Sequence, residues 1–530
     1  MPTPIPTPIP TKLETEVAIV GLGPVGATLA NLLASRGIDV VAIEKDADVH
    51  AKPRAVTLDH EAIRSFQGAG LADRVLPHTI LFQRSVYRGV EGQIIKQLVT
   101  APPPYQLGWC PNYLFSQPVV DRILRDAAAE RPGVTMLVPA EVTDARQDAE
   151  GVTLTVLSQS GECEIRTKYV VACDGASSPI RRQLGIGFDD LAFEEPWLVV
   201  DALIDEAHLA NLPATTVQYC EPQRPATHVV GPGNHRRWEI MMLPGETPEE
   251  INREERIWQL LSRWINPSNA KLWRAAAYRF HALVAHDWHQ GRIILAGDAA
   301  HMTPPFLGQG MCQGLRDAAN IAWKLEFILK RGAPAAPMLA TYMQERGPHV
   351  RATTEVAKAL GRIICELDPV KAAARDAKLL SEGQGREEIR QSLIPDLSAG
   401  ILSKVGGPAV GSIFPQPKVR HSVSEALLDD VTGSDFRLVA RDIDLAQLAG
   451  DPRLNKLGLT LCRLGANTAS RTDNILQVED CDDLLTAWLD RHGTNAALVR
   501  PDHYVFGTAI DLAGARELID ELTSMLFPHA

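Results

Sequence analysis

The sequence contains no apolar run that approaches the roughly 20 residues of a transmembrane helix. It also lacks an excess of positive charge, because its formal net charge is −12 and its isoelectric point is near 5.7. Nucleic-acid-binding surfaces are normally basic, so this composition argues against a nucleic-acid partner. We therefore expect a protein that neither spans a membrane nor binds nucleic acid, and in which local arginines hold any anionic ligand.

Paired cysteines are absent as well. The eight cysteines form no C-x-x-C pair and no Cys/His spacing typical of a zinc site, so we expect no metal and a reducing, cytoplasmic compartment. Signal-peptide features are also missing, because residues 1–10 repeat Pro-Thr-Pro-Ile without a basic or an apolar region. This pattern predicts a disordered or polyproline-like tail over residues 1–14.

A dinucleotide-binding pattern comes next. The apolar run 17–20 predicts a buried strand, the sequence Gly21-Leu-Gly-Pro-Val-Gly26 follows at once, and leucines then recur at helical spacing. A second predicted strand, 40–43, ends in Glu44. Glycines in such a turn let the backbone approach a pyrophosphate, and the acid binds ribose hydroxyls, which favours FAD or NAD over NADP. An ordinary glycine turn is the weaker alternative, because strand, glycines, helix, strand and acid all stand in register.

Two later strand ends also carry polar residues. The apolar run 169–173 ends in Asp174-Gly175, and the run 293–296 ends in Gly297-Asp298. A Pro- and Gly-rich loop follows the second of these and leads into a helical pattern near residue 313. An acid at a strand tip can hold a ribityl hydroxyl, and N–H groups at a helix N-terminus can face an electron-rich ring.

The rest of the nucleotide region departs from a nicotinamide-binding domain, because no second regular half follows the first pattern. Residues 77–118 look irregular and Pro-rich, while 134–138 and 152–157 alternate like strands of an antiparallel ribbon. A Gly- and Pro-rich range, 398–417, predicts a junction before a final small α/β domain. Before that junction, helices are expected over 313–331, 335–347 and 349–366.

Between residues 198 and 280, short alternating segments predict an antiparallel sheet inserted into the nucleotide domain. In the segment 236–242, successive side chains alternate between two faces. The sets are Trp238, Ile240 and Met242 on an apolar face, and Arg237, Glu239 and Met241 on the other. The apolar face either roofs a pocket or packs on helices, and the sequence leaves both open.

Together the motifs resemble those of the single-component FAD-dependent aromatic hydroxylases, the class of para-hydroxybenzoate hydroxylase and phenol hydroxylase. The resemblance covers essentially the whole chain and is closest to the 3-(3-hydroxyphenyl)propionate hydroxylases. Beyond the glycine fingerprint, it is carried by Pro53-Arg-Ala55, Ser116-Gln-Pro118, Val170-Val-Ala-Cys-Asp-Gly175, Met242-Leu-Pro-Gly-Glu246, Leu295-Ala-Gly-Asp-Ala-Ala-His301, Ala322-Trp-Lys-Leu325 and Val499-Arg-Pro-Asp502.

The resemblance implies an α/β fold of three parts. A Rossmann-like FAD-binding domain with a helical extension would occupy residues 15–190 and 281–397, and an inserted antiparallel-sheet substrate domain would occupy 191–280. A thioredoxin-like α/β domain would occupy 410–530. Because the final domain lacks a C-x-x-C pair, we expect it to serve packing or subunit contact, not redox exchange.

The resemblance also implies non-covalent FAD and assigns its contacts. The glycine turn would cradle the pyrophosphate, Glu44 would bind the adenosine ribose, and Asp298 would bind the ribityl chain. The backbone from Gly308 to Cys312 would touch the flavin pyrimidine edge, and since this contact is largely main-chain, Cys312 in place of the usual Asn changes little. The full cofactor set is Gly21, Gly23, Pro24, Val25, Gly26, Glu44, Lys45, Arg54, Gln117, Asp174, Gly297, Asp298, Pro305, Gly308, Gly310, Met311 and Cys312.

For the reaction, the resemblance implies that NADH or NADPH reduces the flavin and that O2 forms a C4a-hydroperoxyflavin. This would ortho-hydroxylate a phenol, with a carboxylated side chain as in 3-(3-hydroxyphenyl)propionate. Candidates for the substrate site are His301, Tyr219 and Arg237, each with a packing role as the alternative, and Arg236 or Arg237 would pair with the carboxylate. Hydroxylation or epoxidation of another aromatic or polyketide-like substrate, and a flavin-binding protein without turnover, are the competing readings. A homodimer is left open.

Overall fold

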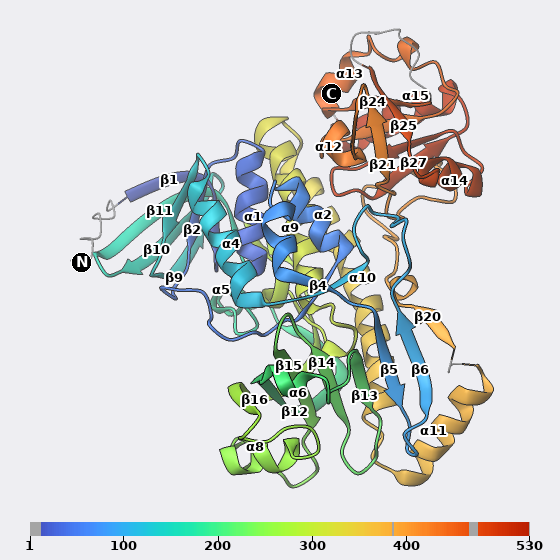
Figure 1. Ribbon diagram of the computed structural model, residues 1–530. Coiled ribbons are helices and arrows are strands. Elements are labelled where there is room, and N and C mark those ends of the chain that lie inside the picture. The colour runs from blue at the N-terminus through green and yellow to red at the C-terminus, as the bar shows by residue number, and fades with distance from the viewer. Residues whose placement is uncertain (1–11, 384–385, 466–474, 529–530) are drawn as a thin grey trace.

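The computed structural model describes residues 12–383, 386–465 and 475–528 (Figure 1). In Figure 1 the nucleotide domain lies at the upper left, the second sheet lies below it, and the C-terminal domain lies at the upper right. Among the described residues, no helix is both long and apolar enough to cross a membrane. Most of the predicted tail, residues 1–11, lies outside this description, and residues 12–14 already belong to the first strand.

The nucleotide domain is built on an eight-stranded sheet. Its main path runs β17 (His289–Gln290), β18 (Ile293–Leu295), β11 (Gly161–Ala172), β1 (Lys12–Val20), β2 (Val40–Ile43) and β8 (Val134–Leu137). Strands β18, β11, β1, β2 and β8 pair in parallel, so their carboxyl ends share one edge. Helices α1 (Pro24–Ser35), α4 (Gln117–Glu130) and α9 (Gly310–Lys330) flank it.

One strand pairing was predicted wrongly. The range 134–138 was expected to form an antiparallel ribbon with 152–157, whereas β8 pairs in parallel with β2. The ribbon is formed by β9 (Ala140–Gln147), β10 (Val152–Ser158) and β11. Alternation predicts a strand but not its partner, and that partner is set by the non-local sheet edge available for pairing.

A second sheet of nine strands closes the molecule below the nucleotide domain. Its order is β19 (His301–Met302), β16 (Ala270–Ala285), β12 (Phe188–Ile204), β15 (His235–Met241), β14 (Ala226–Val230), β13 (Thr216–Tyr219), β5 (Arg84–Arg88), β6 (Ile94–Val99) and β20 (Glu387–Ile389). The sheet therefore takes strands from both sides of the range 191–280. The segment 77–118, expected to be irregular, contains β4 (Thr79–Leu81), β5, β6 and β7 (Asn112–Phe115), which pair with one another and with distant strands.

The helical extension contains one long helix where two were predicted. Instead of two helices, one helix, α10 (Ala335–Ile364), runs through Pro348. Proline removes an N–H donor and disfavours a helix interior. Here the helix buries Tyr342 and Glu345 before the proline and His349 and Val350 after it. This continuous buried face stabilises the helix across the missing hydrogen bond.

The C-terminal domain has a seven-stranded mixed sheet, ordered β22 (Ser424–Leu427), β21 (Lys418–His421), β25 (Ile475–Asp480), β24 (Thr460–Leu464), β23 (Arg437–Ala440), β26 (Ala496–Val499) and β27 (Val505–Ala509). Its description as thioredoxin-like stays a prediction. Burial raises the pKa of the Cys462 thiol to about 12, which disfavours the reactive thiolate.

Buried charges fasten this domain to α10. Arg500 donates to Glu345 Oε2 at 2.7 Å, and Lys324 donates to the same oxygen at 2.8 Å. The Arg500, Glu345 and Lys324 side chains are fully buried. Each charge is therefore paired, as a buried ion requires.

Candidate active site

Parallel pairing brings the three sequence motifs to one edge of the nucleotide sheet. Strands β1, β11 and β18 end at Val20, Ala172 and Leu295, directly before the glycine turn, Asp174-Gly175 and Gly297-Asp298. Ligands of parallel α/β sheets bind outside the carboxyl ends of the strands. Close packing of these turns explains two glycines: a Cβ at Gly21 would overlap the Cys173 carbonyl, and one at Gly26 would overlap the Gly21 carbonyl.

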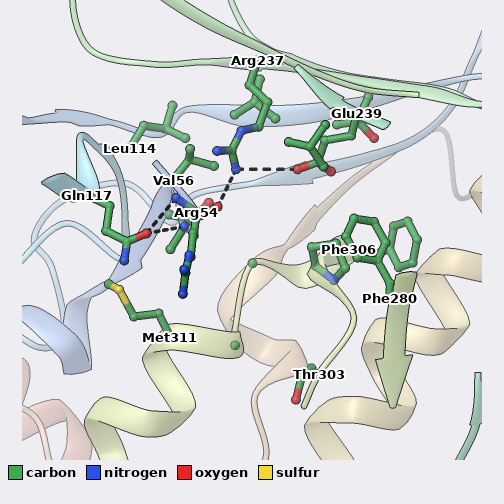
Figure 2. A pocket seen from close by; sticks show the side chains of 18 of the residues that line it. Arg54, Val56, Leu114, Gln117, Arg237, Glu239, Phe280, Thr303, Phe306 and Met311 are labelled. Atoms are coloured by element: carbon green, nitrogen blue, oxygen red, sulfur yellow. Dashed lines mark hydrogen bonds and ion pairs between the residues drawn. The ribbon is translucent and has the colours of Figure 1, made fainter. Parts of the chain in front are cut away.

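A cavity of about 440 Å³ extends from this edge to the second sheet (Figure 2). Part of the predicted cofactor set lines it: Gly23, Pro24, Val25, Arg54, Gln117, Asp298, Pro305, Gly308, Gly310 and Met311. The rest of the set does not line the cavity: Gly21, Gly26, Glu44, Lys45, Asp174, Gly297 and Cys312.

The residues outside the lining differ in their surroundings. Glu44 is buried and accepts hydrogen bonds from the Leu22 N–H at 2.8 Å and Arg125 Nη2 at 3.3 Å, so it holds the glycine turn in place. Lys45 is exposed. Cys312 is fully buried, and burial raises the pKa of its thiol.

Arg54 offers a cation at the nucleotide end of the cavity. Its backbone is fixed, because the Arg54 and Ala55 N–H groups donate to Gln117 Oε1 at 2.9 and 2.6 Å (Figure 2). Its carbonyl accepts from Arg237 Nη1 at 2.7 Å. Within the described part of the chain, the Arg54 guanidinium forms no ion pair or hydrogen bond. The oxygens of a bound pyrophosphate would accept hydrogen bonds from it.

Asp298 offers a hydrogen-bond acceptor further along the cavity. Its side chain is accessible and lines the cavity. Desolvation by the surrounding protein raises the pKa of Asp298. A donating hydroxyl would stabilise the carboxylate, so this position fits the ribityl chain of FAD.

One face of the second sheet forms the far wall of the cavity. Because strand side chains alternate and neighbours are in register, the lining residues share that face. Cross-strand pairs are Ser85 with Thr216, Tyr87 with Gln218, Gln218 with Thr227, Thr227 with Glu239, Val229 with Arg237 and Glu239 with Val199. This wall is largely polar.

The opposite face of the sheet packs on helices. Trp238, Ile240 and Met242 form a core with Ile257 and Leu261 of α8 (Glu254–Leu261). Of the two roles that the sequence left open for the apolar face, packing is therefore the one found. The polar face, not the apolar one, turns to the cavity.

Arg237 lines the cavity but its guanidinium is engaged. It donates through Nε and Nη2 to the Asp201 carboxylate at 2.8 and 3.0 Å, and to the carbonyls of Pro53 and Arg54 at 2.8 and 2.7 Å. Asp201 is fully buried. Arg236 donates to backbone carbonyls, including that of Gly233 at 3.0 Å, and does not line the cavity. Neither arginine has the free guanidinium expected of a carboxylate anchor.

Glu239 is the acid on the polar wall. It is 8% exposed, and its carboxyl lies 3.9 Å from Arg237 Nη1 (Figure 2). Burial raises the pKa of Glu239, and the charge of Arg237 opposes that shift. The only sequence signal for this residue was its position on the same strand face as Arg237.

Two predicted substrate contacts lie elsewhere. Tyr219 belongs to the apolar face, where its hydroxyl accepts from Trp264 Nε1 at 3.2 Å. His301 is 1% exposed and bonds through Nε2 to Asp317 Oδ2 at 2.7 Å. The same Asp317 oxygen accepts from the Gly297 N–H at 3.0 Å. His301 thus supports the turn that carries Asp298, and neither residue lines the cavity.

Aromatic and aliphatic side chains surround the middle of the cavity. Phe280 and Phe306 meet edge to face, with ring centroids 6.1 Å apart, and lie across from Val56 and Leu114 (Figure 2). Such walls hold an aromatic ring by apolar contact and keep water away.

Comparison with known proteins agrees with this geometry. The model of the "FAD binding domain" family matches residues 14–357. A probable NADH-specific resorcinol 4-hydroxylase of Rhodococcus jostii is 34% identical over 97% of this chain and 95% of its own length. A 3-(3-hydroxy-phenyl)propionate/3-hydroxycinnamic acid hydroxylase of Burkholderia cenocepacia is 34% identical over 94% of this chain and 95% of its own. The chain belongs to the FAD-dependent aromatic hydroxylases.

The hydroxylase also matches solved structures along most of its length. A complex of aklavinone-11 hydroxylase with FAD and aklavinone is similar with a TM-score of 0.78 and 23% identity, covering 97% of this chain and 99% of the other. The C-terminal domain matches the model of the "HcaD C-terminal domain" over residues 411–525. Within its described residues, the hydroxylase has no group of three or more His, Cys, Asp or Glu side chains that could hold a metal ion.

Proposed function

We propose that this hydroxylase uses NADH and O2 to ortho-hydroxylate a phenol that bears a short carboxylated side chain. One oxygen atom of O2 enters the ring, the other leaves as water, and NADH supplies two electrons. The two relatives named above support this proposal through their names, one for an NADH-specific donor and the other for 3-(3-hydroxyphenyl)propionate. When bound, FAD supplies the electron transfer and the oxygen chemistry.

The observation that carries the proposal is the juxtaposition of a polar sheet wall, which holds one acid, with the predicted flavin-binding loop across one cavity. Glu239 lines that wall and Gly308 lines the loop. We assign Glu239 as the acceptor of the phenol proton, since a phenolate is the better nucleophile and an acid with a raised pKa is suited to proton transfer.

The other residues hold and shield the reactants. Arg54 and Asp298 bind the cofactor, and the Phe280 and Phe306 rings exclude water from the ring that is hydroxylated. Arg237 positions the segment that carries Arg54, through its bonds to the Pro53 and Arg54 carbonyls.

The proposal is tested by measuring NADH oxidation with a panel of phenols and identifying the products. We expect 3-(3-hydroxyphenyl)propionate to stimulate oxidation, with most of the NADH recovered as catechol product. Resorcinol is the competing substrate, on the name of the Rhodococcus jostii relative. Equal coupling with resorcinol or simple phenol would refute the need for an acid side chain. If no phenol stimulated NADH oxidation, the proposed reaction itself would be refuted.

A further inference from the structure

Arg390 enters the cavity from a part of the chain far from the other site residues. It begins the 3-10 helix η4 (Arg390–Leu393), directly after the edge strand β20. Strand β20 pairs in parallel with β6, with Ile389 opposite Val99. The chain therefore returns to the sheet at its edge and places Arg390 in the cavity lining.

The Arg390 side chain is buried beside the loop that precedes α9. It is 7% exposed, and its Nη2 donates to the Leu307 carbonyl. A Cβ added at Gly308 would lie 2.9 Å from the same nitrogen. The guanidinium carbon also lies 4.9 Å from the centroid of the Phe82 ring. The cation thus stands where the flavin-binding loop meets the aromatic part of the cavity.

Arg390 has no counter-charge within the described part of the chain. Among the residues that the structure describes, no carboxylate forms an ion pair with it, and the nearby Asp59 is paired with Arg316 at 2.7 Å. The arginines on the sheet wall differ, because Arg237 and Arg274 both face the buried Asp201. A buried guanidinium without a partner is costly, and burial lowers the pKa of Arg390 accordingly.

Unpartnered hydroxyls lie on the same sheet. The side-chain oxygens of Ser85 and Thr216 are buried, line the cavity and have no hydrogen-bond partner in the described structure. Ser85 pairs with Leu98 of β6, and Leu98 pairs with Glu388 of β20. These hydroxyls therefore stand two and three strands from the strand that leads to Arg390.

We propose that Arg390 is the specificity-determining residue that binds the side-chain carboxylate of the aromatic substrate. The inference deepens the proposed function and takes over the role that the sequence had suggested for Arg236 or Arg237. It also explains how a chain with a net charge of −12 accepts an anion: a single buried guanidinium, shielded from the surface, supplies the attraction.

The test measures equilibrium binding to the FAD-loaded protein through the change in flavin absorbance. Three probes distinguish the carboxylate of the ligand from its phenol. They are 3-(3-hydroxyphenyl)propionate, its amide, which lacks the charge, and 3-phenylpropionate, which keeps the acid but lacks the phenol. In Arg390→Gln we expect the Kd of both acids to rise about tenfold or more and that of the amide to change less than about twofold. Arg390→Lys should lose less, because it keeps the charge but not the planar fork.

A matched control is Arg84→Gln on the same sheet. Arg84 pairs with Glu387 at 3.5 Å, its side chain is 45% exposed, and it does not line the cavity. This variant removes the same charge outside the site and should leave all three Kd values unchanged.

Three results would overturn the assignment. Unchanged binding of both acids in Arg390→Gln would show that the guanidinium does not contact the carboxylate. Equal weakening of acids and amide, especially with weaker FAD binding, would make Arg390 a support for the Leu307 loop. Weaker binding of the two phenolic probes, with unchanged binding of 3-phenylpropionate, would assign Arg390 to the phenol instead. Because binding needs no turnover, a hydroxylase that converts no phenol would refute the proposed reaction without deciding this inference.

Discussion

Asp298 gives the sharpest test of the cofactor site. Its carboxyl faces the cavity, has no described hydrogen-bond partner and carries a raised pKa because of burial. A hydroxyl donated by the ribityl chain forms a charge-assisted hydrogen bond worth about 1.5–3 kcal/mol. Asp298→Ala should therefore weaken FAD binding by about 10- to 150-fold. Asp298→Asn keeps a neutral acceptor and should cost about fivefold to tenfold.

Although Asp298→Asn should weaken FAD binding, it should stabilise the folded protein when FAD is absent. A carboxyl with a raised pKa binds more protons in the folded state, so the stability it contributes falls as pH rises from the ordinary aspartate value, about 3.9, through the raised value. Asp298→Asn removes that cost, so the apoprotein should melt at a higher temperature at neutral pH. FAD binding favours the carboxylate, so wild-type affinity should increase with pH over this window, and the Asn variant should lose this dependence.

Two measurements check these expectations. Titration of apoprotein with FAD, followed by flavin fluorescence, gives the Kd, and thermal unfolding of the apoprotein gives the stability. Asp287→Ala is a control, because Asp287 is exposed and lies outside the cavity. Unchanged FAD affinity in Asp298→Ala would refute the placement of the ribityl chain, and a destabilised Asn apoprotein would refute the argument from burial.

Four further outcomes are expected. Glu239→Gln should lower kcat/KM for the phenol about a hundredfold and remove the acidic limb of the pH–rate profile, while FAD binding stays unchanged. Arg500→Ala should destabilise the docked C-terminal domain by about 3–5 kcal/mol, seen as earlier cleavage between residues 398 and 417 in limited proteolysis. Although burial alone would raise it, the charge of Arg500 lowers the pKa of Glu345 to about 2, so this docking should be complete above about pH 4.3 and weaken as pH falls. Finally, kcat/KM for oxidation of the nicotinamide donor should be higher with NADH than with NADPH. Equal values would contradict the proposed preference for NADH.

The sequence placed the three nucleotide motifs at strand ends, as the structure has them, because the signals of these motifs are local. Each motif is a strand, a turn and often a helix within a few tens of residues, so Gly21, Asp174 and Asp298 could be placed at strand ends from short windows. Parallel pairing then brings those ends together, as parallel sheets always do. Alternation in the segment 236–242 likewise separated the two faces of that strand correctly.

Longer-range features were predicted less well. The four strands of the segment 77–118 pair with one another and with distant segments such as Thr216–Tyr219. Helix α10 crosses Pro348 because a buried face continues on both sides. Local propensity is a weak signal where pairing and burial decide.

The identity of the charged residues at the site was decided by the tertiary structure alone. Arginines look equivalent in a sequence, but Arg237 forms an ion pair with Asp201, 36 positions away. Arg390 lines the cavity and forms no ion pair with any acid that the structure describes. Likewise, His301 is hydrogen-bonded to Asp317 and does not line the cavity. Glu239 lines the cavity because its side chain lies on the strand face that turns to it. Electrostatic interaction depends on distance in space and on burial, and neither quantity is written in the order of residues.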